Sequence, residues 1–406
     1  MNVWYLNPYD TTPDQQATRT YDYAKELTRR GHKVTMFCSS FSHYSHIEEK
    51  LKKGESWRIE WREGVRIVWV RTWPYSRNDW RRALNMLSFS WSVLWVAGAF
   101  ADRPDVIFGP SVPIFTALSA YILSKLKRSC FIFEIRDLWP QTLVDLGALS
   151  DKGMITRLMR LLERFLYRHS KVIITVLPFA ADYIHSKGVP RNKIFWIPNG
   201  IDLDRYPSMA PRNNKKSEFT LMYIGGFSPY HAVETIIQAA RLLQSEGESR
   251  VKIVLFGDGP EKLNIMKMSR DLKLDNIEFK GLIPKKDLPS VVGEADAFVA
   301  IIRDLPILKY GVNPNKLFEY MAASRPIIFA IRAKNNPVAD AGAGITINPA
   351  DPLALKEAIG KLLVMPAAER EEMGRGGRKY LEANHDIRLL CNNLEKIFQG
   401  VVHEPL

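Results

Sequence analysis

Short apolar runs and amphipathic stretches alternate along the whole chain. Residues 3–6 are uninterrupted apolar positions, as in a buried strand. Residues 17–30 place apolar side chains at helical spacing, and Gly31 follows them as a helix stop. A second apolar run at 34–37 completes a β-α-β unit, which predicts a right-handed crossover and a parallel sheet.

The strand signal continues in two series, separated by a polar segment that contains Pro207 and Pro211. We therefore expect an α/β protein with two Rossmann-like domains, at 1–198 and 218–384, joined by a linker at 199–217. A C-terminal helix, at about 385–400, is expected to pack back on the first domain. The first series comprises 65–70, 106–108, 131–134 and 172–176; the second comprises 219–224, 252–256, 277–279, 297–301, 327–330 and 345–347.

Two stretches of the first domain depart from this pattern. Residues 42–57 are polar and charged without clean periodicity, which predicts a mobile insertion. Basic and aromatic residues at 73–82 lead into an uncharged block at 83–101. Three interpretations of that block stay open: a buried core helix, an interfacial membrane-binding helix, or a membrane span, against which its serines weigh.

The net charge of +13 is concentrated in the first half of the chain. Residues 1–198 hold 29 Lys and Arg against 18 Asp and Glu, a balance of +11, and the remainder has a balance of +2. A basic domain of this kind suits an anionic membrane, phosphorylated substrates or nucleic acid, or is simply a basic surface.

The three cysteines are widely spaced, which argues against a disulfide scaffold or zinc site and fits a reducing compartment. Since residues 1–6 lack signal-peptide features, we expect a cytoplasmic protein.

Three segments of the second domain could bind a nucleotide. Gly225-Gly226 and Gly257-Asp258-Gly259 each follow a strand, as either phosphate cradles or structural turns. Residues 313–323 read as a helix with Lys316 in its first turn, where a cation opposes the helix dipole unless an anion binds. Glu319 lies one turn further and could accept from ribose hydroxyls. The alternative is a surface Lys–Glu pair.

That helix, followed by Arg-Pro-Ile-Ile at 325–328, resembles the donor-binding signature of family 4 glycosyltransferases, whose GT-B fold has two Rossmann-like domains facing a cleft. Further similarities follow the family order, at 25–35, 197–202, 257–260, 281–284 and 295–297. Residues 134–140, Glu-Ile-Arg-Asp-Leu-Trp-Pro, are similar to a bacterial branch that builds O-antigen and capsule units and includes fucosamine transferases.

The resemblance implies retaining, metal-independent transfer of a sugar, with an N-acetylated deoxyhexose as a candidate. The donor would be a nucleotide diphosphate sugar, UDP-linked, and the acceptor a polyprenyl-diphosphate-linked glycan. It implies no cofactor, no metal and no nucleic-acid partner. Such an acceptor, with the basic domain, places the enzyme peripherally on an anionic membrane surface, the inner face of the cell membrane.

The resemblance also assigns site residues. The catalytic set is Asp137, Arg136 and Lys316, and the acceptor-binding set is Gln16 and Arg19. The donor-binding set is Gly225, Gly226, Asp258, Ile283, Asn315, Lys316, Leu317 and Glu319.

The chain departs from the family pattern at several of its motifs. Gly311 stands where many relatives carry the first of two glutamates, and Gly226 and His231 stand where many carry arginine and lysine. Lys316 is therefore expected to carry more of the phosphate charge. The loop at 12–17 lacks the usual Gly-Gly, which leaves the acceptor side open. The competing functions are a nucleotide-sugar epimerase of the same fold and a non-catalytic nucleotide-sugar-binding subunit.

Overall fold

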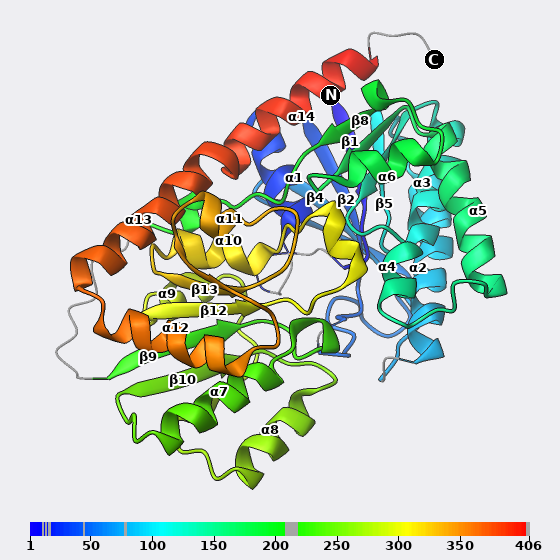
Figure 1. Ribbon diagram of the computed structural model, residues 1–406. Coiled ribbons are helices and arrows are strands. Elements are labelled where there is room, and N and C mark those ends of the chain that lie inside the picture. The colour runs from blue at the N-terminus through cyan, green and yellow to red at the C-terminus, as the bar shows by residue number, and fades with distance from the viewer. Residues whose placement is uncertain are drawn as a thin grey trace. The chain divides into compact units, whose positions relative to one another are not determined.

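The computed structural model describes residues 1–9, 12, 14, 18–43, 45–76, 79–207 and 218–402 (Figure 1). The chain divides into two compact units. Unit 1 is Met1–Asn199 with Ile387–Leu406, and unit 2 is Gly200–Asp386. Residues 200–207, which fall in the expected linker, belong to unit 2. The rest of that linker, 208–217, lies outside the described residues.

Unit 1 is built on an eight-stranded sheet in the order β3-β4-β2-β1-β5-β6-β7-β8. All neighbouring pairs are parallel except the β3–β4 hairpin. Every strand predicted in this half is confirmed, whereas β3 and β8 were not predicted. The strands are β1 (Asn2–Leu6), β2 (Lys33–Ser39), β3 (Trp57–Arg62), β4 (Val65–Val70), β5 (Val106–Pro110), β6 (Cys130–Ile135), β7 (Val172–Thr175) and β8 (Ile194–Trp196).

Helices cover both faces of this sheet (Figure 1). On one face, α1 (Arg19–Arg29) packs against α14 (Ile387–Val402), the last helix of the chain, and Arg30 just beyond α1 pairs with Glu395. The other face carries α2 (Trp80–Ala99), α3 (Ile114–Lys127) and α5 (Met154–His169). The short helices α4 (Gln141–Asp145) and α6 (Ala180–Ser186), and the 3₁₀ turn η1 (Arg191–Lys193), complete unit 1.

The uncharged block at 83–101 forms most of α2. No helix in the described ranges combines the length and the apolarity that crossing a membrane requires, so the span interpretation is wrong. One side of α2, which includes Phe89 and Val93, is buried against unit 1, while Trp91 and Trp95 are exposed. The helix is therefore a core element on one side only.

Unit 2 is built on a six-stranded parallel sheet in the order β11-β10-β9-β12-β13-β14. All six predicted strands of this half are confirmed. They are β9 (Phe219–Ile224), β10 (Val251–Phe256), β11 (Ile277–Phe279), β12 (Ala297–Ile301), β13 (Ile327–Ala330) and β14 (Gly344–Ile347). The order reverses direction between β9 and β12. In open α/β sheets, ligands bind beyond the carboxyl ends of the strands at such a reversal.

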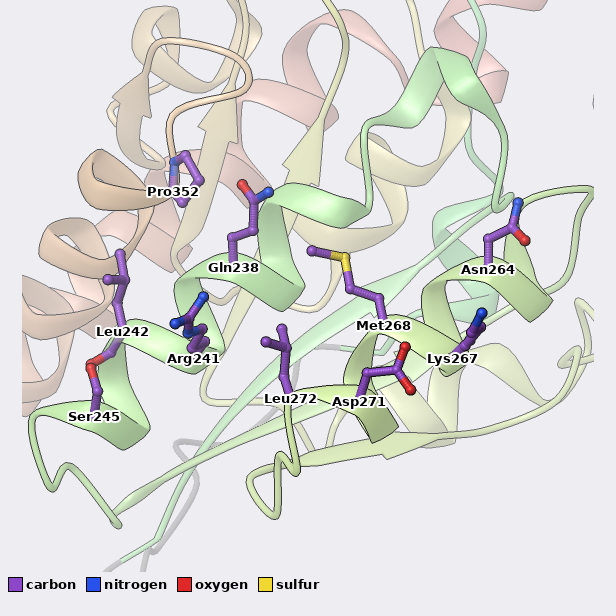
Figure 2. Close-up of a pocket in the computed structure, with 10 residues that line it drawn as sticks. All are labelled: Gln238, Arg241, Leu242, Ser245, Asn264, Lys267, Met268, Asp271, Leu272 and Pro352. Atoms are coloured by element: carbon purple, nitrogen blue, oxygen red, sulfur yellow. The ribbon is translucent and has the colours of Figure 1, made fainter.

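The helices of unit 2 enclose its apolar core, in which α7 (Glu234–Ser245) packs on α12 (Pro352–Val364) and α10 (Asn315–Ala322) packs on α13 (Ala367–Asn384). A groove of about 830 Å³ lies between α7 and α8 (Figure 2). None of the predicted site residues lines this groove, so it is separate from the loops that the sequence points to. The elements are η2 (Leu203–Arg205), η3 (Pro229–His231), α7 (Glu234–Ser245), α8 (Lys262–Asp271), α9 (Leu288–Val292), η4 (Pro306–Tyr310), α10 (Asn315–Ala322), α11 (Pro337–Asp340), α12 (Pro352–Val364) and α13 (Ala367–Asn384).

Candidate active site

Helix α10 is fixed against the end of β9 by one tyrosine. The hydroxyl of Tyr320 accepts from the N–H of Ile224 at 2.7 Å and donates to the carbonyl oxygen of Ile224 at 2.9 Å. The Tyr320 ring is stacked on Phe298 of β12, with ring centroids 4.2 Å apart. The start of α10 is thereby held at the point where the strand order reverses.

This attachment brings Lys316 to the paired glycines. The Lys316 ammonium lies 3.4 Å from the hydroxyl of Tyr223 and 4.9 Å from the centre of its ring. A Cβ atom on Gly225 would lie only 2.7 Å from the Lys316 Nζ atom. Glycine at 225 therefore leaves room for the ammonium group. The structure joins two motifs that the sequence had indicated separately.

The second glycine loop supports the first by close backbone contact. A Cβ atom on Gly257 would lie 1.9 Å from the carbonyl oxygen of Gly225, and Gly257 has a φ of +134°. The carbonyl oxygen of Asp258 accepts from the N–H of Phe227 at 2.9 Å. The Asp258 carboxylate accepts from the N–H of Gly259 at 2.7 Å. The contacts of Asp258 are those of a loop support, and its donor-binding role stays a prediction.

The charge state of this site is set by burial. Partial burial lowers the pKa of Lys316 to about 7. No carboxylate in the described ranges lies within ion-pair distance of its ammonium. Burial, and then the nearby Lys316, hold the pKa of His231 well below its usual value, so His231 is neutral. The His231 Nδ1 atom lies 3.0 Å from the hydroxyl oxygen of Ser228. An anion at this position would meet one uncompensated cation and a neutral imidazole.

Glu319 is paired with a residue that the sequence did not single out. Its buried carboxylate forms an ion pair with Lys285, which follows the predicted Ile283 in the loop after β11. Lys316 contacts Tyr223 rather than Glu319, so the interpretation as a surface Lys–Glu pair is wrong. No local pattern around Lys285 indicates this contact, since it is more than thirty residues away from Glu319 in sequence.

Two other predicted donor-binding residues on α10 differ in exposure. Asn315, the first residue of the helix, is exposed and available to a ligand. Leu317 is fully buried in the core, and its N–H donates to the carbonyl oxygen of Pro314 at 3.1 Å. This side chain completes the apolar face of α10, and the donor-binding role of Leu317 stays a prediction.

Gly311 explains one departure from the family pattern. It ends the 3₁₀ turn η4 with a φ of +88° and a ψ of 177°. That backbone conformation strongly favours glycine, because a Cβ atom would clash with the neighbouring peptide groups. A glutamate at 311 would therefore require a different loop.

In unit 1, the predicted catalytic pair follows β6. Arg136 pairs with the buried Glu134, with its Nε 3.1 Å from a carboxylate oxygen. The hydroxyl of Ser111 accepts from the N–H groups of Arg136 and Asp137 and donates to the Asp137 carbonyl oxygen at 2.7 Å. The Asp137 side chain is exposed. Ser111 thus fixes the backbone, Arg136 has a structural partner, and Asp137 is left facing solvent.

Arg19 is also part of this network. Its guanidinium lies 3.1 Å from Glu134 and donates to the carbonyl oxygens of Ile197 at 3.2 Å and Pro198 at 2.6 Å. The side chain is almost fully buried. These contacts give Arg19 structural partners, and its acceptor-binding role stays a prediction. Gln16, its predicted companion, lies outside the described residues.

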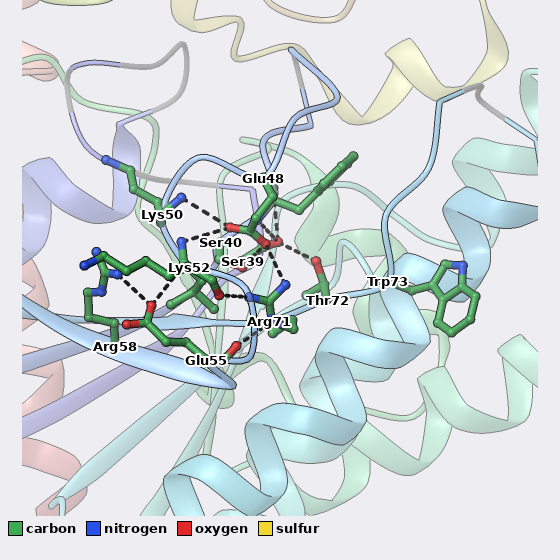
Figure 3. A network of polar contacts seen from close by, with 12 residues as sticks. Ser39, Ser40, Glu48, Lys50, Lys52, Glu55, Arg58, Arg71, Thr72 and Trp73 are labelled. Carbon is green, nitrogen blue, oxygen red and sulfur yellow. Dashed lines mark hydrogen bonds and ion pairs between the residues drawn. The ribbon is translucent and has the colours of Figure 1, made fainter.

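The loop after β2 is held by polar contacts (Figure 3). The Glu48 carboxylate accepts from the hydroxyl of Ser40 at 2.8 Å and from the N–H groups of Lys50 and Leu51. The Ser39 and Thr72 hydroxyl oxygens lie 2.9 Å apart and link β2 to the segment after β4. The described part of 42–57 is therefore joined to the sheet by hydrogen bonds, and its mobility stays a prediction.

Aromatic and histidine side chains gather beside this loop, at the carboxyl ends of β1, β2 and β4. The rings of Tyr9 and His43 lie 5.0 Å apart, and those of His46 and Tyr75 lie 4.9 Å apart. Burial, with nearby Arg82 and His46, lowers the pKa of His43 to about 3. No local pattern in the sequence indicates this cluster.

The described residues contain no group of three His, Cys, Asp or Glu side chains that could hold a metal ion. The groups that the unit 2 site brings together are an ammonium, backbone amides and an imidazole. In its ammonium form Lys316 stabilises an anion, together with the backbone amide donors.

Comparison with known proteins identifies the class. Residues 16–200 match the model of the glycosyl transferase 4-like domain, and residues 218–364 match that of glycosyl transferases group 1. WbjE of Pseudomonas aeruginosa, named as a probable glycosyltransferase, is 21% identical over 298 residues, or 70% of this chain and 72% of WbjE. WcaL of Escherichia coli K12, a candidate colanic acid biosynthesis glycosyltransferase, is 19% identical over 243 residues, or 58% of each chain.

Solved structures share the fold at low identity. Sucrose-phosphate synthase from Thermosynechococcus elongatus has a TM-score of 0.75 at 16% identity, covering 98% of each chain. HepE of Anabaena, solved in complex with UDP and glucose, has a TM-score of 0.69 at 13% identity, covering 98% of this chain and 99% of HepE.

The matched models and these folds define a glycosyltransferase of the GT-B type. The chain belongs to the family 4 glycosyltransferases. This assignment replaces the epimerase and the non-catalytic binding subunit as the function of the chain.

Proposed function

We propose that this enzyme transfers a sugar, with retention of anomeric configuration, from a UDP-linked donor to a polyprenyl-diphosphate-linked glycan in surface polysaccharide synthesis. The observation that carries the donor assignment is the Lys316 ammonium beside Gly225 at the reversal of the unit 2 sheet. The complex of HepE with UDP and glucose, on the same fold, supports a UDP-linked donor. WcaL supports polysaccharide synthesis.

The proposed chemistry is stabilisation of a departing diphosphate. As the sugar–phosphate bond breaks, negative charge accumulates on the leaving diphosphate, and a preorganised cation lowers the barrier. Lys316 supplies that cation, and the N–H of Gly226 supplies a donor, since the N–H of Gly225 is bonded to the carbonyl oxygen of Phe256. Glu319 accepts from the ribose hydroxyls, with Lys285 orienting its carboxylate. In unit 1 we assign Asp137 to orienting the acceptor rather than to covalent catalysis.

The acceptor and the place of reaction follow from the charge of unit 1. A polyprenyl tail stays in the bilayer, so the enzyme must work at the membrane surface. The +11 balance of residues 1–198 favours an anionic surface, and we propose the inner face of the cell membrane.

A donor screen tests the proposal. The purified enzyme is incubated with UDP-, GDP- and dTDP-linked sugars, including N-acetylated deoxyhexoses, with and without a polyprenyl-diphosphate-linked acceptor. We expect only the UDP-linked sugars to react. Without an acceptor they should be hydrolysed slowly, and with the lipid-linked acceptor they should be turned over faster, by transfer of the sugar. Turnover only with GDP- or dTDP-sugars would contradict the donor assignment, and equal turnover with a water-soluble acceptor would contradict the lipid assignment.

A further inference from the structure

Helix α2 presents a stripe of apolar side chains to solvent. Trp80, Leu84, Leu87, Trp91 and Trp95 recur at spacings of three and four residues, and all five are exposed. Trp91 is 63% exposed and Trp95 is 68% exposed, and their rings lie 6.1 Å apart. Water-exposed tryptophans in a row are unfavourable unless another phase or molecule covers them.

The stripe continues onto the neighbouring helices. Helix α3 packs against both α2 and α5, so the three lie side by side on one face of the unit 1 sheet (Figure 1). On α3, Leu126 is exposed. On α5, Met154, Leu158 and Leu161 are exposed, and Met154 is 78% exposed. We call the exposed side of α2, α3 and α5 the three-helix face.

The charges on this face have one sign. Helices α2 and α3 contain no acidic residue, and the single acidic residue of α5, Glu163, is buried. Arg157, Arg164 and Arg168 on α5 are exposed among the apolar side chains, whereas Arg81 on α2 lies 3.8 Å from the carboxylate of the N-cap residue Asp79. A surface of tryptophan, leucine and arginine without exposed acid on its helices complements anionic lipid headgroups above an apolar layer.

We propose that the three-helix face inserts into the headgroup layer of an anionic membrane, with Trp91 and Trp95 at headgroup depth and the arginines on lipid phosphates. This proposal specifies the surface through which the membrane association of the proposed function takes place. It rests on the proposed function only for the identity of the acceptor. It places the centre of contact at the middle of α2 and on α5. Apolar insertion gives an attachment that high salt weakens but does not abolish.

Vesicle sedimentation with the full chain tests this placement. The variants are Trp91→Ser/Trp95→Ser on α2 and Leu158→Ser/Leu161→Ser on α5. The matched control is Leu263→Ser/Val364→Ser in unit 2, where the two side chains are 77% and 75% exposed. With phosphatidylglycerol vesicles, we expect each face variant to bind about tenfold more weakly than the wild type, and the control to bind like it. Phosphatidylcholine vesicles should bind the wild type more weakly than phosphatidylglycerol vesicles.

Three results would overturn the inference. The wild type could stay in the supernatant with phosphatidylglycerol vesicles, or the face variants could bind as tightly as the wild type. Alternatively, sedimentation velocity could show a wild-type dimer that Trp91→Ser/Trp95→Ser converts to monomer, which would assign the face to a second copy of the chain. Calorimetric titration of each variant with UDP separates the two proposals, because unit 2 carries the donor site. Failure of the wild type to bind any nucleotide would contradict the donor assignment and would not affect the conclusion from the vesicle experiment.

Discussion

The ammonium group of Lys316 lies in the first turn of α10, where the helix dipole opposes a cation. Tyr223 holds it beside Gly225, and partial burial makes its charged form costly. A residue that opposes its local environment is expected where the protein is built to receive a ligand. The ligand that resolves this conflict is an anion.

The turnover of Lys316→Ala measures that role. We expect a loss of about two to four orders of magnitude in kcat, as for other preorganised electrostatic groups, because the departing diphosphate would lose its cation. The melting temperature without donor should hold or rise, since a buried ammonium is removed. Lys316→Arg serves as the matched control that keeps the charge. Near-normal turnover of Lys316→Ala would place phosphate binding elsewhere.

Proton uptake on UDP binding provides a second test of Lys316. The pKa of about 7 leaves the free enzyme mostly unprotonated at this residue at pH 8. A bound diphosphate favours the ammonium form and raises its pKa, so binding should take up close to one proton at pH 8 and weaken as pH rises above 7.

Calorimetry at pH 8 in two buffers of different ionisation enthalpy counts these protons. Lys316→Arg should bind UDP with little buffer dependence, because arginine stays charged. Equal binding enthalpies for the wild type in both buffers would mean that Lys316 does not change protonation.

Glu319→Gln tests the ribose contact. The carboxylate is buried and paired with Lys285, so its loss removes an acceptor and leaves that lysine uncompensated. We expect UDP to bind about tenfold or more weakly, by titration calorimetry, while UMP and UDP lose similar factors because both carry the ribose. An unchanged dissociation constant would assign Glu319 to structure alone.

At this scale, the sequence predicted residues whose motif is local. Lys316 and Gly225 each stand out by position relative to a strand or helix end. Lys285 and Tyr320 act through partners brought together by the fold, which no local pattern around either residue indicates. Arg19 illustrates the converse. Its segment marks the opening helix, but does not indicate its contacts with Glu134 and with Pro198.

Among the elements, buried strands were predictable because an apolar run between turns has few other structures available to it. Strand β3 was missed because it lies at the sheet edge, where Trp57 and Trp61 are exposed beside charged neighbours. Strand β8 has three residues and no run to detect. In α2, hydropathy predicts the wrong buried side of the helix. Asn85 and Ser90 face the core, while the tryptophans of this helix are exposed.

Helix α5 carries a buried carboxylate that makes a prediction about stability. Burial raises the pKa of Glu163 to about 7, while Tyr167, whose hydroxyl lies 3.1 Å from a carboxylate oxygen, opposes the shift. The folded state then binds a proton more tightly than the unfolded state. The unfolding free energy therefore falls as pH rises from about 4.5 to about 7, by an amount on the order of 3 kcal/mol.

Glu163→Gln keeps the shape of the side chain without the charge. We expect it to raise the free energy of unfolding at pH 8 and to leave it nearly unchanged at pH 5, in urea titrations. Glu357→Gln, on the exposed side of α12, is the matched control and should change neither value. Equal stability of wild type and Glu163→Gln at both pH values would show that Glu163 titrates normally.

Across the whole molecule, the alternation of strands and helices predicted the α/β class, and the family motifs predicted the GT-B fold. The class and the fold both follow from patterns spread over the chain, so missing a single strand such as β3 did not alter either prediction. The excess of basic residues in the first half of the chain was equally visible in the sequence, but the binding partner of that half was not. A count of lysines and arginines does not show that the arginines of α5 stand among exposed leucines on one face.

The whole reaction should proceed without a divalent cation. A diphosphate leaving group needs roughly one or two positive charges near it, which enzymes supply either with a metal or with fixed cations and amides. Lys316, the start of α10 and the amide of Gly226 form a set of the second kind. Transfer from a UDP-sugar should therefore survive dialysis against EDTA and gain little from added magnesium or manganese. The control is Lys316→Ala, in which added magnesium should restore part of the lost rate if charge alone is missing. Complete inhibition of the wild type by EDTA, reversed by one metal, would show that a cation shares the diphosphate with Lys316.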